Sequence, residues 1–240
     1  MYQGLRVLLL SCAYNEEGKI GDVFERLSRL SLGDGMLLID DGSTDRTAEI
    51  AEEHGCEVIR LGACLGVGFA LRRGLEEARA RDYDVVVTIA GNNKDDPEEI
   101  PRLLDAIVAG HDFVIGSRFL EGGGYGGDMP FYRKFATRLH PFLVGLFCGQ
   151  RITESTNGFR AMRLSVLDDE RIDLHQDWLD HYELEVYLLM KLMLLDYRTT
   201  EVPCTKIYPA KKLGRTKMRP FTDWWKMLRP IFLLGLRLKR

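Results

Sequence analysis

The sequence predicts an α/β protein with a mainly parallel sheet that carries helices on both faces. Five apolar, strand-like runs alternate with helix-like patterns over residues 5–117. This alternation is typical of parallel strands joined by crossover helices. Turn-forming residues follow the strand-like runs, most clearly DDGSTD at 40–45. They should lie at the sheet edge where α/β proteins bind ligands.

The expected strands are rich in Leu, Ile and Val, and the expected helices repeat apolar residues at helical spacing. In chain order they are LRVLLLSCA, a helix at 18–31, MLLID, a helix at 44–54, CEVIRL, a helix at 66–82, YDVVVTIA, a helix at 97–109 and DFVIGS.

The pattern changes after residue 120. We expect a mobile Gly-rich loop at EGGGYGGDMP, because this segment is too long for a simple turn. The elements expected after it are a helix at 131–148, a loop at TESTNGFRAM, a helix near 181–195, a short strand at 198–203 and the basic stretch YPAKKLGRTKMRP. Because no linker or internal repeat interrupts the chain, we predict one domain over 1–217, with a nucleotide-binding type of first half (1–120), and a basic amphipathic helix at 218–240.

Composition excludes several classes of protein. With 240 residues, 45% of them hydrophobic, the chain can build one substantial core. Its five cysteines form no CxxC pair, which disfavours a structural zinc and favours a reducing compartment. The N-terminus shows no signal-peptide pattern, and no run approaches the roughly 18 apolar residues of a membrane span. We therefore expect a cytoplasmic protein.

Charge is distributed unevenly along the chain. Residues 211–240 contain ten Lys or Arg and one acidic residue, so they carry +9 while residues 1–210 carry −12. The basic segment also contains Trp224, Trp225 and several aliphatic residues. This mixture suits a helix in the headgroup region of an anionic bilayer and not a nucleic-acid site. A C-terminal helix docked on its own domain explains the pattern equally well, and both interpretations can hold for different faces.

Two polar segments follow the first two expected strands. In AYNEE, Tyr14 can stack on a base, while Asn15 and Glu16 can bond its edge or a ribose; taken alone, an N-cap for the next helix is the simpler explanation. In IDDGSTD, capping explains Ser43 to Asp45. It does not explain Asp40 and Asp41, whose carboxylates suit ribose or base hydrogen bonding.

Two further segments are less specific. LGACLGVGFALRRG has some similarity to a dinucleotide fingerprint, which would suit a nicotinamide-dependent oxidoreductase. The third glycine is missing at the expected spacing, so a helix opened by glycine near a ligand is the better interpretation. Arg118 in VIGSRF is well placed for a phosphate at the end of the fifth strand, although a surface arginine would look the same.

Together these segments resemble a known family. The ordered series YNEE, DDGSTD, LGVGFALRRGL, PEEIPRLL, GSR, a Gly-rich loop, STNGFRAM, YELEVYLL and EVP resembles the polyprenyl-phosphate sugar transferases, which include the dolichyl-phosphate mannosyltransferases. They are inverting family 2 glycosyltransferases with the GT-A fold. The resemblance covers about residues 5–217, with donor binding in 1–120 and acceptor binding in 121–217.

The resemblance implies a UDP- or GDP-sugar donor and a polyprenyl or dolichyl phosphate acceptor. The enzyme would act at the inner face of an anionic membrane as a peripheral protein. The residues it assigns to donor binding are Ala13, Tyr14, Asn15, Glu16, Asp40, Asp41, Gly91, Asn92 and Lys217. The residues it assigns to the phosphates and the reaction are Lys94, Arg118, Arg133 and Arg215.

The resemblance also implies an acceptor pocket. Asn157, Gly158 and Phe159 would shape it, with Glu183 and Glu185 on the helix beneath. A lipid phosphate needs no strong base. If the acceptor were a hydroxyl of a glycan or small molecule, one of these two glutamates would have to take its proton.

The segment TIAGNNKDDPEE departs from the family pattern. Family members usually have Asp-x-Asp followed two residues later by Gln, and these groups hold Mg²⁺ or Mn²⁺. The matching positions here are Ala90, Asn92 and Lys94. Hard divalent ions prefer anionic oxygen ligands, so we expect the Lys94 ammonium to take the place of the metal. The alternatives are a metal held by Asn92 and Asp95, or a protein that binds nucleotide sugars without catalysis.

Overall fold

The computed structural model describes residues 1–127, 131–208 and 222–239, and for residues 131–133 it describes the backbone only. Its central sheet has seven strands in the order β3-β2-β1-β4-β7-β5-β8. All neighbouring strands are parallel except β7, which is antiparallel to both β4 and β5. The strands are β1 Val7–Ala13, β2 Gly35–Asp40, β3 Glu57–Arg60, β4 Val85–Thr88, β5 Phe113–Ser117, β7 Arg160–Arg163 and β8 Thr199–Pro203. The expected α/β class with a mainly parallel sheet is confirmed.

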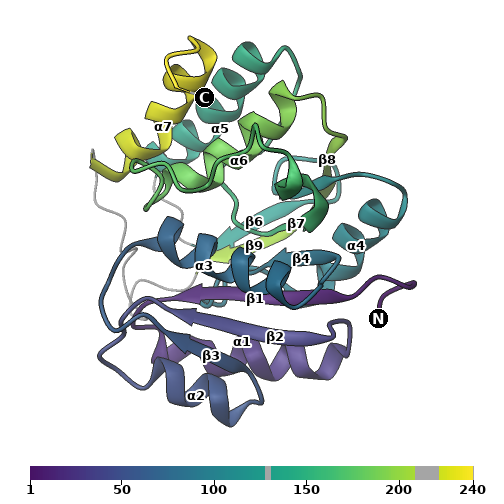
Figure 1. Ribbon diagram of the computed structural model, residues 1–240, viewed down its shortest axis with the longest axis vertical. Helices are drawn as coiled ribbons and strands as arrows, with labels where there is room; N and C mark the ends of the chain where they lie inside the picture. Colours follow the sequence, from purple (N-terminus) through teal and green to yellow (C-terminus); the bar gives the residue numbers. More distant parts are fainter. Residues whose placement is uncertain (128–130, 209–221, 240) are drawn as a thin grey trace.

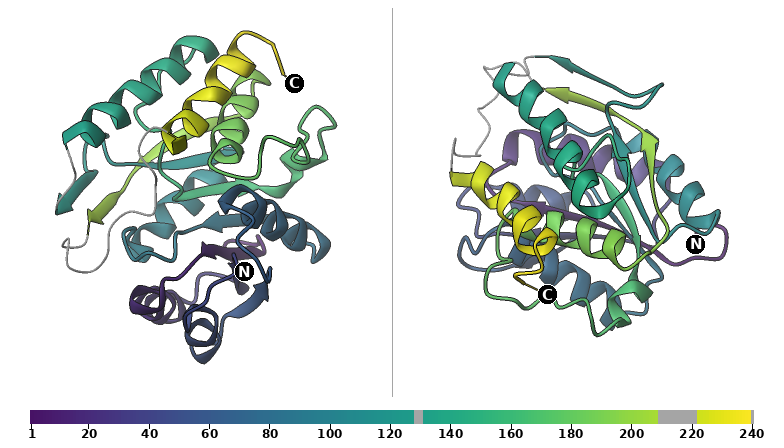
Figure 2. Two further views of the ribbon diagram at one scale, coloured as in Figure 1. Left: turned by 90° about the vertical axis from the view of Figure 1, so that its left-hand side faces the viewer. Right: turned by 90° about the horizontal axis from the view of Figure 1, so that it is seen from above.

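The two faces of the sheet are covered by different helices, as Figures 1 and 2 show. Alternating side chains of β1 explain this: Leu9 packs with α1 and α4, while Leu8 and Leu10 pack in the cluster that includes α3 and α6. The helices are α1 Glu17–Leu30, α2 Thr47–Glu53, α3 Val67–Ala80, α4 Ile100–Val108, α5 Phe131–Cys148, α6 Glu183–Leu194 and α7 Thr222–Gly235, with 3₁₀ turns at Pro97–Glu99 and Leu164–Asp168.

Two segments expected to be loops contain strands. The loop expected at TESTNGFRAM ends in β7, which lies between β4 and β5. In the Gly-rich segment, β6 Gly124–Gly127 pairs in parallel with β9 Thr205–Tyr208. Both expectations were wrong for the same reason: these strands are only four residues long. They depend on backbone pairing with distant partners and not on a local apolar run.

Helices α5, α6 and α7 gather at the end of the molecule opposite α1 and α2 (Figure 1). Met227, Ile231 and Leu234 of α7 are buried, and Ile231 and Leu234 belong to the core cluster that contains most of the buried α6 residues. The docked interpretation therefore describes one face of the C-terminal helix. Within the described residues, no helix is both long enough and apolar enough to cross a membrane.

Candidate active site

A cavity of about 300 Å³ lies at the carboxyl ends of β1 and β4. Its walls come from the segments after these strands, from α3, α6 and β9, and from Trp224 and Met227 of α7. Parallel strands end at this edge, so the backbone delivers several polar loops to one place. The cavity is therefore the candidate ligand site.

One end of the cavity carries aromatic and acidic groups. Tyr14, Glu16 and Asp41 line it, as does Lys19, whose ammonium lies 2.7 Å from a Glu16 carboxylate oxygen. The Asp41 carboxylate also accepts hydrogen bonds from the backbone N–H groups of Leu65 and Gly66 at 2.7 and 3.0 Å. It is thus held rigidly at the start of α3.

Two residues expected at this end serve the neighbouring turns instead. The Asp40 carboxylate accepts from the Ser43 backbone N–H at 3.2 Å. Asn15 has a positive backbone φ of 52°. Its side-chain oxygen accepts a hydrogen bond from the Thr44 backbone N–H at 2.8 Å. Neither side chain belongs to the cavity wall. The Asn15 contact ties the loop after β1 to the loop after β2, whereas the Asp40 contact closes the turn that follows β2.

The glycines that resemble a dinucleotide fingerprint have a packing role. A Cβ on Gly66 would lie 2.4 Å from the Asp180 carbonyl oxygen, and one on Gly68 would lie 2.1 Å from the Leu179 carbonyl oxygen. Only glycine allows α3 to start this close to the loop that precedes α6. The glycine pattern therefore needs no dinucleotide to explain it.

The segment after β4 forms the floor of the cavity. Ala90, Gly91, Asn92 and Lys94 all line it. Gly91 packs closely, because a Cβ there would lie 2.4 Å from the Ile20 Cδ1 atom and 3.1 Å from the Ala13 Cβ atom. The Asn92 side-chain oxygen is buried and has no hydrogen-bond partner among the described residues. A buried unsatisfied oxygen is costly, so this atom is suited to contact a bound ligand.

The other end of the cavity is rich in cations. Lys94 Nζ lies 5.8 Å from the centroid of the Tyr208 ring, and the Tyr208 hydroxyl accepts from Arg118 at 2.6 Å. Lys206 lines the same end. Three positive side chains from three different segments therefore converge here.

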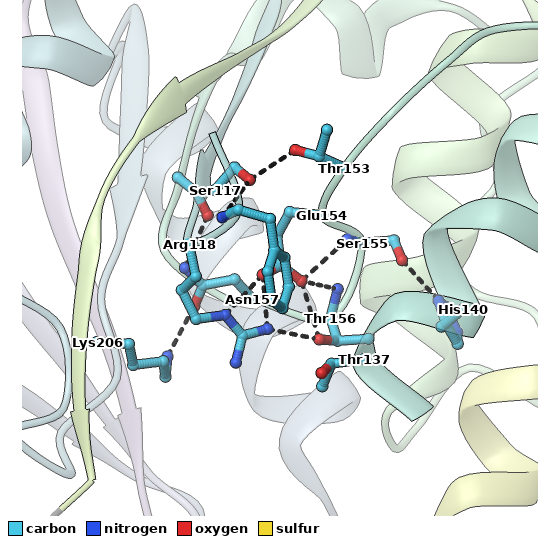
Figure 3. A network of polar contacts seen from close by, with 12 residues as sticks. Ser117, Arg118, Thr137, His140, Thr153, Glu154, Ser155, Thr156, Asn157 and Lys206 are labelled. Carbon is cyan, nitrogen blue, oxygen red and sulfur yellow. Dashed lines mark hydrogen bonds and ion pairs between the residues drawn. The ribbon is translucent and has the colours of Figure 1, made fainter. Parts of the chain in front are cut away.

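Arg118 is at the centre of a buried network (Figure 3). Its Nε donates to Glu154 at 2.6 Å, and another nitrogen donates to the Thr156 hydroxyl at 2.9 Å. Burial would lower the pKa of Arg118, but Glu154, with Tyr208 and Cys204, more than offsets this and raises it. With the ion pair from Nη2 to Glu154 at 2.6 Å and the bond to Tyr208, these contacts engage four of the five guanidinium N–H groups, so one remains for a ligand in the cavity.

The same network reaches α5 and α7 through His140. This residue is buried, and its Nε2 donates to the Met227 carbonyl at 3.0 Å while its Nδ1 accepts from the Ser155 hydroxyl at 2.7 Å. Burial lowers the pKa of His140 to about 4. The neutral imidazole thus joins the loop at 153–157 to the C-terminal helix.

The two glutamates of the expected acceptor pocket differ in position. Glu185 lines the cavity, and Gly158 lies so near that a Cβ there would be 2.8 Å from a Glu185 carboxylate oxygen. Glu183 is fully buried, and one of its carboxylate oxygens lies 2.8 Å from an Arg229 guanidinium nitrogen. Burial raises the pKa of Glu183. Only Glu185 faces the space where an acceptor could lie.

Other expected residues cannot be placed at the site. The side chain of Arg133 and all of Arg215 and Lys217 lie outside the described residues. Conversely, sequence analysis missed Lys206, Tyr208 and Trp224, which line the cavity. The first two lie on β9, a four-residue strand that pairs with the distant β6, so no local pattern marked them.

The cavity does not fit a divalent cation well. Asp95 has a fully buried side chain, and its Oδ1 atom accepts from Lys206 Nζ at 2.6 Å. In the described part of the chain, no three His, Cys, Asp or Glu side chains form a group able to hold a metal. At the positions of the family's metal motif, Asn92 offers one buried oxygen without a hydrogen-bond partner among the described residues, and Lys94 offers an ammonium. A hard ion needs several oxygen ligands, preferably anionic, and these residues do not supply them.

The strand order, the antiparallel β7 and the cavity at the strand ends define a GT-A type of nucleotide-sugar transferase fold. The chain belongs to glycosyl transferase family 2, whose model matches residues 9–171. The expected family and fold are therefore confirmed.

Several curated relatives are similar over most of their length. Polyprenol monophosphomannose synthase of Mycolicibacterium smegmatis is 31% identical over 223 residues, which cover 89% of this chain and 81% of that protein. Dolichyl-phosphate hexose transferase of Haloferax volcanii is 32% identical over 208 residues, which cover 87% of this chain and 84% of that protein. Undecaprenyl-phosphate mannosyltransferase of Micrococcus luteus is 31% identical, and the match covers 89% of this chain and 88% of that protein.

Solved structures support the fold. Glucosyl-3-phosphoglycerate synthase from Mycobacterium tuberculosis, in complex with Mg²⁺ and UDP, has a TM-score of 0.72 at 22% identity and covers 99% of this chain and 82% of that one. The same enzyme with Mn²⁺, UDP and glucosyl-3-phosphoglycerate has a TM-score of 0.70. These neighbours bind a metal with UDP, in contrast to the poor metal fit of the cavity described above.

Proposed function

We propose that this protein transfers a sugar from a UDP- or GDP-sugar to a polyprenyl or dolichyl phosphate. One observation carries the proposal: the same cavity is lined by Tyr14, Glu16 and Asp41, which follow β1 and β2, and by Lys94, Lys206 and Arg118, which come from β9 and from the segments after β4 and β5. The first group suits a nucleoside and the second suits its diphosphate. The names of the three curated relatives support a polyprenyl-type phosphate acceptor.

The reaction would be one in-line displacement with inversion. An oxygen of the lipid phosphate attacks the anomeric carbon, and the bond from that carbon to the diphosphate oxygen breaks. The electron pair leaves with the nucleoside diphosphate. Because the nucleophile is already anionic, no proton has to move, and catalysis depends on positioning and on stabilising the leaving group.

Lys94 takes the role of the metal in this proposal. It lines the cavity where relatives of this family usually have a metal-binding motif, and it lies beside Asn92 and Tyr208. An ammonium carries one charge where a divalent ion carries two, so its attraction at equal distance is about half. Arg118 and the further basic residues Arg133, Arg215 and Lys217 would contribute the remainder.

The acceptor places the reaction at a membrane, and α5 carries a matching surface. Phe135, Phe142 and Leu146 are 65%, 65% and 66% exposed and lie with Leu139 on one face of the helix. Arg138 lies among them and is also exposed. An open hollow of about 860 Å³ beside α5 is lined by Arg118, Arg138, Phe142 and Leu146, among others. Apolar side chains interspersed with cations suit peripheral contact with the anionic inner face of a membrane.

A direct assay tests the function. Purified protein is incubated with UDP- and GDP-sugars and with undecaprenyl or dolichyl phosphate in detergent, with EDTA or with Mg²⁺. We expect a lipid-linked sugar of inverted configuration in the presence of EDTA. No turnover with any donor and any lipid phosphate would support a non-catalytic binder instead.

A hydroxyl acceptor is the second candidate, because Glu185 lines the cavity and could act as a base. The Glu185→Gln variant separates the two. For a phosphate acceptor its kcat should change by less than about tenfold, whereas loss of a general base costs about a hundredfold or more.

A further inference from the structure

We propose that Lys206 is a second cation of the diphosphate site, held in place by Asp95 and Asn157. The proposal rests on the proposed function, since it assumes a nucleoside diphosphate sugar as donor. It also reassigns Asp95, which sequence analysis considered as a metal ligand.

The backbone brings Lys206 to the segment after β4. Asp95 and Lys206 form an antiparallel bridge, and the Ile207 backbone N–H donates to the Lys94 carbonyl at 2.8 Å. Lys206 and Tyr208 are alternate residues of β9, and both side chains line the cavity, while Ile207 between them is exposed. Main-chain contacts therefore place Lys94 and Lys206 side by side at the same end of the cavity.

The Lys206 ammonium is fixed by two buried oxygens (Figure 3 shows the contact with Asn157). Asp95 Oδ1 lies at 2.6 Å and Asn157 Oδ1 at 2.7 Å, and the Lys206 side chain is only 12% exposed. The Asn157 amide donates to the Gly116 carbonyl at 2.8 Å, so its oxygen is directed toward Lys206. An ammonium has three N–H donors. Two are used here, and one remains on the cavity side.

A purely structural role explains these contacts less well. A buried ion pair adds little to stability compared with apolar residues of the same size. This pair also leaves the Asp95 Oδ2 atom buried without a hydrogen-bond partner in the described part of the chain. The arrangement is costly for the fold, yet it directs a rigid cation into the cavity. This is the expected pattern when the group serves a ligand and not the fold.

The ligand that fits is a diphosphate. Lys94, Lys206 and Arg118 can each donate to a different phosphate oxygen, because they come from the loop after β4, from β9 and from the end of β5. Hydrogen bonds from charged donors are stronger than neutral ones. Fixed ammonium and guanidinium groups would thus do at this site what the bound metal does in other members of the family.

The test uses calorimetry on the full chain in EDTA. UDP and GDP are titrated first, and the tighter of the two is then compared with its parent nucleoside. The variants are Lys206→Met and the double variant Lys206→Met with Asp95→Asn. The double variant keeps the net charge of the site and leaves no unpaired buried carboxylate, so it tests the idea even if the single variant does not fold. Arg163→Met is the control, because the Arg163 side chain donates to the backbone carbonyls of Ile107 and His111 and does not line the cavity.

We expect both Lys206 variants to bind the nucleoside diphosphate about tenfold more weakly or worse. Affinity for the nucleoside should stay within about twofold, since its end of the cavity is unchanged. If Lys206 only neutralises Asp95, the double variant will bind the diphosphate as the wild type does, and the proposal is wrong. Wild-type binding that requires Mg²⁺ would also overturn it. Failure of the wild type to bind either diphosphate would instead refute the proposed function itself.

Discussion

Replacing Lys94 by methionine removes the charge while keeping most of the side-chain volume. In the protein without ligand, the Lys94 ammonium lies 5.8 Å from the centroid of the Tyr208 ring. A cation–π contact of this kind is worth about 0.5–1 kcal/mol at exposed sites; a urea unfolding curve checks that Lys94→Met is folded. In the transition state, a well-aimed charge on the leaving group is worth about 3–4 kcal/mol. Since about 1.4 kcal/mol corresponds to a factor of ten, kcat should fall by about a hundredfold or more.

The assay for this prediction measures kcat and KM for sugar transfer to a lipid phosphate in EDTA. Lys94→Arg should recover part of the rate, because it restores a cation. Arg29→Met serves as the control, since it removes an exposed cation that is paired with Glu25 on α1. If Lys94→Met turns over within about threefold of the wild type, or if EDTA abolishes the wild-type activity, a metal and not Lys94 stabilises the diphosphate.

The remaining predictions concern stability and membrane binding. Glu154→Gln leaves Arg118 without its buried counter-ion, so urea denaturation should show a loss of about 3 kcal/mol; an unchanged midpoint would contradict this. The pKa of His140 is about 4 in the folded protein and about 6.5 when unfolded, so the unfolded state binds more protons between these values. Stability should therefore fall by about 3 kcal/mol as the pH falls from 7 to 4, and His140→Gln should remove this part of the pH dependence. Phe142→Asp should weaken binding to anionic liposomes by about tenfold or more. The control Val108→Asp, at the end of α4, should leave liposome binding unchanged. Equal effects of the two substitutions would argue against membrane contact through the α5 surface.

Long elements with local patterns could be predicted from the sequence. The expected helix at 131–148 matches α5 in both bounds, and those at 18–31 and 66–82 match α1 and α3 within two residues at each end. Their apolar spacing is sufficient, because each buries one apolar face in the core. Strands β6, β7 and β9 are four residues each and are specified by partners far away in the chain. No local pattern distinguishes them from loops.

At the candidate site, too, some residues could be predicted from the sequence and others could not. Tyr14, Glu16, Asp41, Lys94 and Arg118 were expected at the ligand from their places after strands, and all line the cavity. Asn15 and Asp40 stand at equally good positions in the sequence but bond to the neighbouring turn. Which way a side chain turns at a strand end depends on contacts between two loops, and a single sequence does not contain that information.

Lys206 could not be assigned for a related reason. Its role depends on Asp95 and Asn157, which are 111 and 49 residues away along the chain. Each of the three is unremarkable in its own segment. Only the pairing of β9 with the loop after β4 makes them one group.

The two adjacent tryptophans at the start of α7 point to different surroundings. Trp224 forms part of the cavity wall, whereas Trp225 is 59% exposed. With buried Trp178 as a common background, a Trp225→Phe protein would retain an indole at the cavity, and a Trp224→Phe protein would retain the exposed indole that bilayer contact would reach. Emission spectra of this pair could therefore time donor capture and bilayer contact separately, and so reveal which of the two events comes first.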